Sequence, residues 1–141
     1  MKLIAKTSAL LMFALAMVAV TSCNKYEEGS NFSLLSAKAR LVNDWKVQKV
    51  TYQSGGYATY AYPNMTTSIK KDNTYLSKVY SGSGSYEVNG VWSFNSDKTQ
   101  VTFVESDGDT SIYTIIKLKD KELTLQMVEG SITTTIELIQ Q

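Results

Sequence analysis

The sequence predicts an all-β fold, an eight-stranded up-and-down antiparallel barrel preceded by a short N-terminal helix. Beyond Asn43, apolar and polar residues alternate along short segments, which is the period of half-buried strands. Groups of Gly, Asp, Asn and Ser separate these segments, and such residues form hairpin turns. Closure into a barrel would remove the exposed edges that an open sheet leaves.

Residues 1–22 have the pattern of a secretory signal peptide. Two lysines precede an unbroken apolar run over 9–20, and small residues follow it. A run of this length is too short to cross a hydrocarbon core of about 30 Å, which needs roughly 20 helical residues. We therefore predict that residues 1–22 direct export and are then removed.

Cys23 is the only cysteine, and it directly follows the small residues Thr21 and Ser22. This arrangement resembles a relaxed bacterial lipobox, with Val20 in place of leucine, as in lipoproteins of Bacteroidetes-type bacteria. The resemblance implies that Cys23 is acylated, with palmitate among its chains, and several chains give a stable attachment that one chain cannot. We expect an exported lipoprotein attached to the outer membrane, at its periplasmic face or at the cell surface. The alternative is an ordinary signal peptide with an incidental cysteine.

Residues 23–32, the acylated cysteine and a polar stretch without periodicity, are interpreted as a flexible tether. Treated as a coil, this stretch reaches roughly 15–18 Å, so the domain at 33–141 would lie close to the membrane. Glu27 and Glu28 resemble acidic signals that send some lipoproteins to the cell surface, although a solvated linker explains them equally well.

The domain at 33–141 begins with a predicted helix over 33–42, in which apolar residues recur at helical spacing. Ser33 is a suitable N-cap, and Asn43 is a suitable stop because asparagine tolerates the left-handed conformation. The predicted strands follow at 44–52, 66–70, 74–80, 86–95, 100–105, 110–118, 122–128 and 132–139.

Two irregularities are predicted within these strands. Trp45 and Val47 would lie on the face opposite Val50 unless a bulge near 48–49 changes the phase. Asn89-Gly90 is a strong hairpin dipeptide. A turn there would split the longest apolar alternation in the chain, so we predict a continuous strand with a glycine kink.

The alternation places Trp92 inside the barrel and Val91 outside. The predicted inward set is almost wholly apolar, so it offers no partner for an ion, and burying an unpaired ion carries a prohibitive desolvation cost. Any ligand is therefore expected to be uncharged or to keep its charge outside the barrel. The inward set comprises Tyr86, Val88, Trp92, Phe94, Val101, Phe103, Ile112, Ile116, Leu125, Ile136 and Leu138.

Composition excludes several classes of function. Of the 14 basic residues, 12 remain after the two signal lysines are removed, against 13 acidic ones, and a net charge of −1 argues against nucleic-acid binding. The chain has no histidine, the usual general base and zinc ligand, and an acylated Cys23 leaves no thiol. Asp107-Gly108-Asp109 is better explained by a hairpin turn than by calcium. We expect no enzyme activity, no cofactor, no metal and no nucleic-acid partner.

A short helix, then Asn43-Asp44-Trp45, then a meander of strands, resembles the lipocalin-like domains of bacterial lipoproteins. Gly90-Val91-Trp92-Ser93-Phe94 is similar to a second recurring pattern of that family, and the resemblance covers 33–141. In lipocalins a Gly-x-Trp opens the first strand. Here Trp45 matches the tryptophan, Asn43 replaces the glycine, and the late arginine that stacks on the tryptophan has no counterpart after Arg40. The resemblance implies a barrel that carries a small ligand.

The candidate ligand contacts are aromatic. Four tyrosines crowd the segment after the first strand, and in a lipocalin-like barrel this first long loop lies over the open mouth. Tyrosine rings there could contact a hydrocarbon or a sugar face while their hydroxyls stay wet. Alternatively, Tyr60 and Tyr62 alternate outward on an irregular edge strand. The candidate mouth and wall residues are Tyr52, Tyr57, Tyr60, Tyr62, Tyr86, Trp92, Phe94 and Phe103.

Two functions remain open. The first is a membrane-anchored, monomeric lipoprotein that binds a small apolar or amphipathic ligand in or at the mouth of its barrel. The second is a non-catalytic structural or interaction barrel that docks another component of the cell envelope or a glycan. A continuous internal cavity favours the first, whereas a filled interior with an exposed aromatic patch favours the second.

The lipid anchor is tested by Cys23→Ala. This change should move the protein from the detergent-extracted membrane fraction into the soluble exported fraction, because acylation needs the thiol. Ser22→Ala, which keeps a small residue before the cysteine, should leave the protein in the membrane fraction. Mass spectrometry that maps the mature N-terminus elsewhere, without added lipid mass, would show that the lipoprotein interpretation is wrong.

Overall fold

The computed structural model describes residue 26 and residues 34–141. The predicted signal peptide, Cys23 and the rest of the predicted tether lie outside these residues. The described elements are α2 (Ala37–Leu41), β1 (Asn43–Ser54), β2 (Tyr57–Ala61), β3 (Met65–Ile69), β4 (Thr74–Ser81), β5 (Gly84–Phe94), β6 (Gln100–Glu105), β7 (Thr110–Leu118), β8 (Glu122–Glu129) and β9 (Ile132–Gln140).

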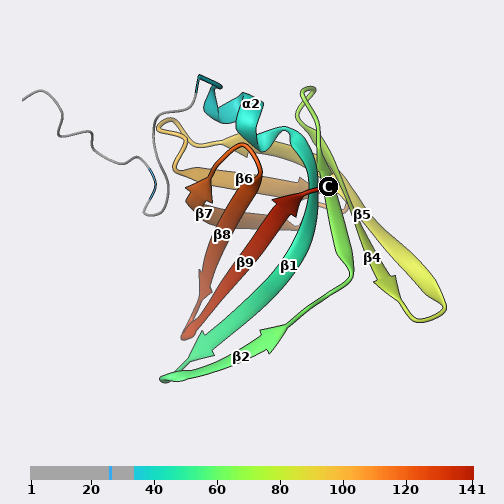
Figure 1. Ribbon diagram of the computed structural model, residues 1–141, viewed down its shortest axis with the longest axis vertical. Coiled ribbons are helices and arrows are strands. Elements are labelled where there is room, and N and C mark those ends of the chain that lie inside the picture. Colours follow the sequence, from blue (N-terminus) through green and yellow to red (C-terminus); the bar gives the residue numbers. More distant parts are fainter. Residues whose placement is uncertain (1–25, 27–33) are drawn as a thin grey trace, which may run out of the picture.

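The strands form a closed antiparallel barrel, as predicted (Figure 1). Strands β3 to β9 follow one another in sequence order across the sheet, and β1 pairs with both β3 and β9, which closes the ring. The eight-stranded up-and-down barrel is therefore confirmed. Strand β2 lies outside the ring and, within the described residues, pairs with β1 alone.

The segment after β1 was expected to be a loop over the mouth, with an irregular edge strand as the alternative, and β2 agrees with the alternative. The first half of β1 pairs with β3, whereas its second half, from Val50 to Ser54, pairs with β2. Gly55 and Gly56, with φ angles of 57° and 83°, form the two-residue turn that joins them, and two positive φ angles suit this type of hairpin. Strand β2 has no buried face, so it lacks the apolar alternation by which a strand is found in a sequence.

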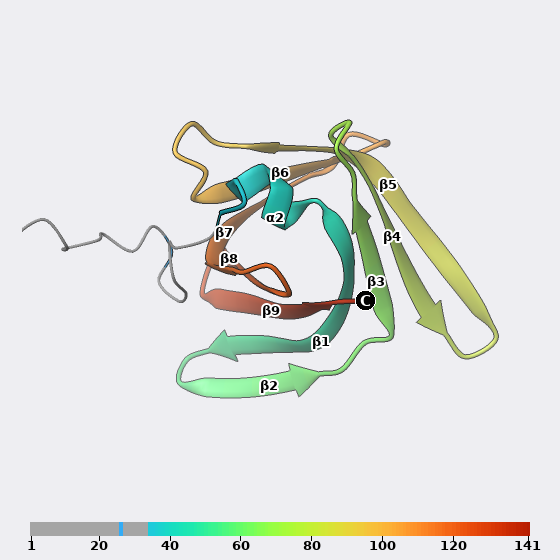
Figure 2. The ribbon, with the colours of Figure 1, turned by 45° about the horizontal axis from the view of Figure 1, so that its top comes forward.

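The two ends of the barrel differ. Helix α2 covers one end, together with the turns that precede β4, β6 and β8 (Figure 2). The hairpin turns at the other end are those before β2, β5, β7 and β9. The helix is shorter than predicted and its N-cap is Ser36, whose hydroxyl oxygen accepts from the Ala39 N–H at 3.1 Å. Leu34 and Leu35 precede this helix and are exposed.

The closed end is tightly packed around Trp45. Both Trp45 and Leu41 are fully buried, and the indole Nε1 donates a hydrogen bond to the Leu41 carbonyl at 2.9 Å. The buried Arg40 donates from Nη1 to the Leu118 carbonyl at 2.7 Å. These bonds attach α2 to β1 and β7, so the helix is a fixed plug.

Tyr26 differs from the expected flexible tether. Its side chain is only 2% exposed and belongs to the core cluster. The ring lies 5.8 Å from the Arg40 guanidinium, within cation–π range, and the hydroxyl donates to the Lys98 carbonyl at 3.3 Å. Burial raises the pKa of the Tyr26 phenol, against a smaller opposing effect of Arg40. The chain is thus held against the closed end three residues after Cys23.

The bulge predicted near 48–49 in β1 is confirmed. The pairing of β1 with β9 shifts register between Val47 and Lys49, and Trp45, Val47 and Val50 are all buried as a result. A second bulge, in β7 between Ile115 and Lys117, was not predicted.

The bulge in β7 corrects the predicted phase of that strand. Ile112 was expected inside the barrel but is 53% exposed, whereas Tyr113 is partly buried and packs against the core. An extra residue exchanges the two faces of a strand. Counting alternate residues back from Leu118 therefore assigns the wrong face to the residues before the bulge.

Asn89-Gly90 lies inside a continuous strand, as predicted. Gly90 pairs with Tyr75 of β4 on one side and with Glu105 of β6 on the other. A Cβ atom at position 90 would overlap the Val104 carbonyl oxygen. Glycine is therefore required here by the close approach of β5 to β6.

Gly90→Ala should destabilise the barrel by about 1–3 kcal/mol, the usual cost of inserting atoms where none fit. Gly84, on the same strand, has open space around it and an ordinary φ, so Gly84→Ala should change the unfolding free energy by no more than roughly 0.5 kcal/mol. Urea unfolding followed by tryptophan emission measures both. Equal losses would contradict the close approach.

Trp92→Ala should cost on the order of 3–5 kcal/mol, the range for deleting a large buried aromatic side chain. Trp92 is 3% exposed and donates from Nε1 to the Lys70 carbonyl at 3.0 Å. Val91 on the opposite face is 52% exposed, so Val91→Thr should stay within roughly 1 kcal/mol. Thermal unfolding of the two variants with similar midpoints would count against this strand phase.

Candidate ligand-binding cavity

The barrel encloses a cavity of about 210 Å³ between the helix-covered end and the open end, lined by side chains of all eight barrel strands. A dry cavity of about 150 Å³ is enough to bind benzene, whereas pockets for drug-sized ligands begin near 300 Å³. The interior is therefore neither filled solid nor large enough to enclose a long molecule.

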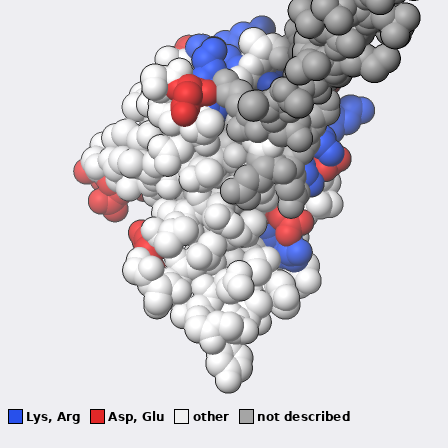
Figure 3. Space-filling view, turned by 90° about the vertical axis from the view of Figure 1, so that its left-hand side faces the viewer, with Lys and Arg blue, Asp and Glu red and all other residues white. Residues whose placement is uncertain are grey.

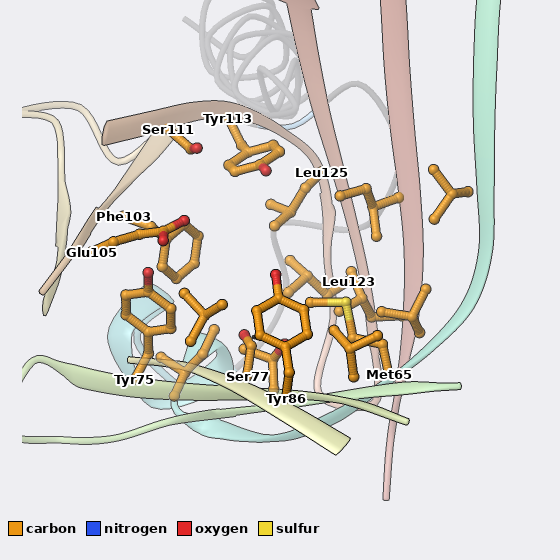
Figure 4. Close-up of a pocket in the computed structure, with 18 residues that line it drawn as sticks. Met65, Tyr75, Ser77, Tyr86, Phe103, Glu105, Ser111, Tyr113, Leu123 and Leu125 are labelled. Atoms are coloured by element: carbon orange, nitrogen blue, oxygen red, sulfur yellow. Dashed lines mark hydrogen bonds between the residues drawn. The ribbon is translucent and has the colours of Figure 1, made fainter. Parts of the chain in front are cut away.

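The wall of the cavity toward the helix is apolar. Val47, Leu138 and Leu123 are cross-strand neighbours on β1, β9 and β8, and Ile69 of β3 joins them. All four are buried. Leu125 and Met65 extend this wall toward the open end, and Figure 4 shows them grouped with Leu123 on one side of the space. An apolar group bound here would leave water completely.

The other side of the cavity carries polar atoms from four strands. They belong to Tyr75 of β4, Tyr86 of β5, Glu105 of β6, and Ser111 and Tyr113 of β7. In Figure 4 the Tyr86 hydroxyl points into the open space, and Glu105, Ser111 and Tyr113 border the same space. The cavity is amphipathic, with a hydrogen-bonding side opposite the apolar wall.

Three aromatic rings hold this polar side in place. The Tyr75 and Phe103 ring centroids are 4.9 Å apart with planes at 75°, and the Phe103 and Tyr113 centroids are 6.0 Å apart with planes at 73°. Such edge-to-face pairs are favourable beyond the area that they bury. The tyrosine rings are thus fixed before any ligand arrives.

The phenols are held in their neutral form. Burial, with smaller contributions from Glu105, Tyr113 and Asp107, raises the pKa of Tyr75 to about 12. Burial also raises the pKa of Tyr113, against an opposing effect of the Ser111 hydroxyl. At neutral pH both groups therefore remain hydroxyls that can donate and accept hydrogen bonds.

Glu105 corrects the expectation of a wall without charge. It shares the inward face of β6 with Val101 and Phe103, and its carboxylate borders the cavity. Within the described part of the chain, this carboxylate forms no ion pair, and none of the described residues that line the cavity is a lysine or an arginine. The alternation at 101, 103 and 105 could have revealed it. Tyr113 and Ser111 could not be found because of the bulge in β7.

The predicted aromatic site residues fall into four groups. Tyr86 and Phe103 line the cavity. Trp92 and Phe94 do not; they pack edge-to-face at 5.4 Å in the helix-covered half of the barrel. Tyr52 is 43% exposed and contributes to the raised pKa of Tyr113, so it lies near the rim.

Tyr57, Tyr60 and Tyr62 belong to β2 and the residue after it, and they do not line the cavity. The expected loop over the mouth is therefore wrong. All three are exposed, and Tyr60 lies 5.8 Å from the Lys49 ammonium on the outer face. Strand alternation puts Tyr57 on the opposite face from Tyr60. A contact between these tyrosines and a ligand stays a prediction.

Cys23, the predicted lipidation site, lies outside the described residues. Within those residues, no helix has the length and apolar character needed to cross a membrane. The same residues contain no cluster of three side chains suited to hold a metal ion.

No family model matches the chain, and no curated protein matches it in sequence. Among solved structures, the barrel is similar to a lipocalin-like protein from Bacteroides uniformis, with a TM-score of 0.56 and 14% sequence identity. The match covers 72% of this chain and 99% of that protein. At this identity the match supports the fold alone. It confirms the lipocalin-like fold that the sequence resemblance implied. The chain therefore has the lipocalin-like fold.

Proposed function

We propose that this protein is an exported, membrane-anchored lipoprotein that binds a small amphipathic molecule inside its barrel. The observation that carries the proposal is the cavity, which has an apolar wall on one side and hydroxyls and a carboxylate on the other. A ligand would enter with its apolar part first and leave its polar group among the tyrosines. The lipocalin-like fold supports a binding role rather than a catalytic one.

The volume of the cavity limits the ligand. A space of about 210 Å³ corresponds to roughly seven water molecules at ~30 Å³ each. It therefore suits a molecule with one ring or a short chain, on the order of ten non-hydrogen atoms. A longer molecule would have to extend through the open end, past Tyr52 and the hairpin turns.

The expected affinity is modest. A single ring buries about 150–250 Å², which contributes about 4–6 kcal/mol at ~25 cal/mol per Å². The loss of translational and rotational freedom offsets several kcal/mol of this gain. The buried apolar area alone therefore gives dissociation constants no tighter than the millimolar range, and well-placed polar contacts would have to supply any tighter binding.

The proposed anchor and the proposed cavity are compatible. If Cys23 carries lipid, the burial of Tyr26 beneath the helix-covered end would keep that end near the bilayer. The open end would then face away from the membrane, where a water-soluble ligand can reach it.

The alternative, a filled barrel that docks another envelope component, has less support because the interior is not filled. Its best argument is the uncharged surface around the β1–β2 hairpin. No charged residue occurs between Lys49 and Lys70, and the lower part of the molecule, which contains this hairpin, is white in Figure 3. Exposed Tyr57 and Tyr60 lie on it.

The cavity is tested by titrating the purified protein with neutral 2-phenylethanol, followed by calorimetry up to millimolar concentration. Val88 lines the cavity, and Val91 lies on the outer face of the same strand. Val88→Phe should fill part of the space and weaken binding by roughly tenfold or more, equivalent to at least ~1.4 kcal/mol. Val91→Phe, the matched control, should leave the affinity unchanged.

Two outcomes would contradict a cavity ligand. One is the absence of saturable binding by any single-ring probe. The other is binding that Val88→Phe leaves intact but that a Tyr57/Tyr60/Tyr62→Ala triple variant weakens, which would move the site to the β1–β2 hairpin as the sequence predicted.

A further inference from the structure

We propose that the cavity selects ligands that carry a positively charged amine, with the Glu105 carboxylate as the ionic partner of the ammonium group. This inference rests on the proposed binding function and adds the chemical class of the ligand to it.

The first argument is the position of Glu105. Val101 and Phe103 of β6 are buried inside the barrel, and strand alternation turns Glu105 to the same side. Its cross-strand neighbour on β5 is Gly90, which has no side chain that could cover the Glu105 carboxylate. The carboxylate therefore stands at the cavity wall with space before it (Figure 4).

Among the described residues, none supplies a counter-ion to Glu105. Three other acids of the described barrel strands pair with lysines, in Lys49–Glu137 and Lys78–Glu87, both at 2.7 Å, and in Lys117–Glu122 at 3.3 Å. Glu105 forms no such pair within the described residues. A half-buried carboxylate without a partner loses hydration and gains nothing in exchange, so a cationic ligand would supply the missing interaction.

The groups around Glu105 are neutral or negatively charged. The titratable side chains that line the cavity with it are Tyr75, Tyr86 and Tyr113, and phenols are uncharged at neutral pH. Asp107 and Glu129 lie close enough to raise the pKa values of Tyr75 and Tyr113, respectively. The polar side of the cavity is therefore negative, which attracts a cation and repels a carboxylate ligand.

The tyrosines suit an ammonium group in two further ways. Their hydroxyl oxygens accept hydrogen bonds, and an ammonium group has only donors to offer. Aromatic rings also attract a cation by about 0.5–2 kcal/mol when it lies within ~6 Å of the ring. A metal ion is a poorer match, because calcium takes six to eight oxygen ligands and, of the described residues, Glu105 alone contributes a carboxylate to this cavity.

The test compares three ligands of similar size that differ in charge. They are 2-phenylethylamine, 2-phenylethanol and phenylacetate, titrated into the purified protein at pH 7 by calorimetry. The amine should bind roughly tenfold more tightly than the alcohol, in keeping with hydrogen bonds to charged groups of ~1.5–3 kcal/mol. Phenylacetate should bind more weakly than the alcohol.

Glu105→Gln keeps the shape of the side chain and removes its charge. In this variant 2-phenylethylamine should lose its advantage of roughly tenfold over 2-phenylethanol, and tryptophan emission shows whether the barrel is folded. Glu87→Gln is the matched control, because Glu87 lies on the outer face of β5 and pairs with Lys78. It should leave the preference for the amine unchanged.

The outcomes separate this inference from the function on which it rests. If the alcohol binds but the amine binds no more tightly, or if Glu105→Gln keeps the preference for the amine, the charge selection is wrong and the cavity function stands. If none of the three ligands binds, the proposed cavity function fails with it.

Discussion

Strand β1 holds the barrel closed, because it pairs with three other strands along its length. One edge pairs with β9 and closes the ring, while the other edge pairs first with β3 and then with β2. A straight strand could not keep Trp45, Val47 and Val50 on one side, and the bulge at Gln48 makes this possible. The same strand therefore holds helix α2 over one end of the barrel and forms part of the cavity wall.

The cavity exists because large side chains are concentrated in one half of the barrel. Trp45, Trp92 and Leu41 fill the helix-covered half, and eight strands leave a lumen that side chains of this size can fill. Toward the open end the inward positions include smaller residues such as Thr67 and Ser77, whose hydroxyls satisfy each other at 2.9 Å. These two residues line the cavity on adjacent strands, where larger side chains would reduce its volume.

The sequence was sufficient to predict the barrel but not to identify the residues that line the cavity. Alternation and turn residues predicted eight strands, and the phase conflict between Val47 and Val50 revealed the bulge in β1. The bulge in β7 was not detected, so the exposed Ile112 was placed inside the barrel and Tyr113, which lines the cavity, was not identified. Strand β2 was expected only as an alternative to a loop, because its pairing with β1 requires no buried face. Aromatic crowding drew attention to Tyr57 and Tyr60, whereas the cavity is defined by residues that meet only after closure.

Glu105 links the fold to the proposed ligand class. A carboxylate on an inward position of a strand reduces the apolar area that the strand can bury, and nothing in the described structure pairs with it. A residue that opposes folding in this way is best explained by a role in binding, since natural proteins accept local losses of stability at functional sites. The rigid aromatic neighbours strengthen this reading: Phe103 packs between Tyr75 and Tyr113, so the groups around the carboxylate are already ordered. Binding would then cost little side-chain entropy, and a small amine could be held by a cavity of modest size.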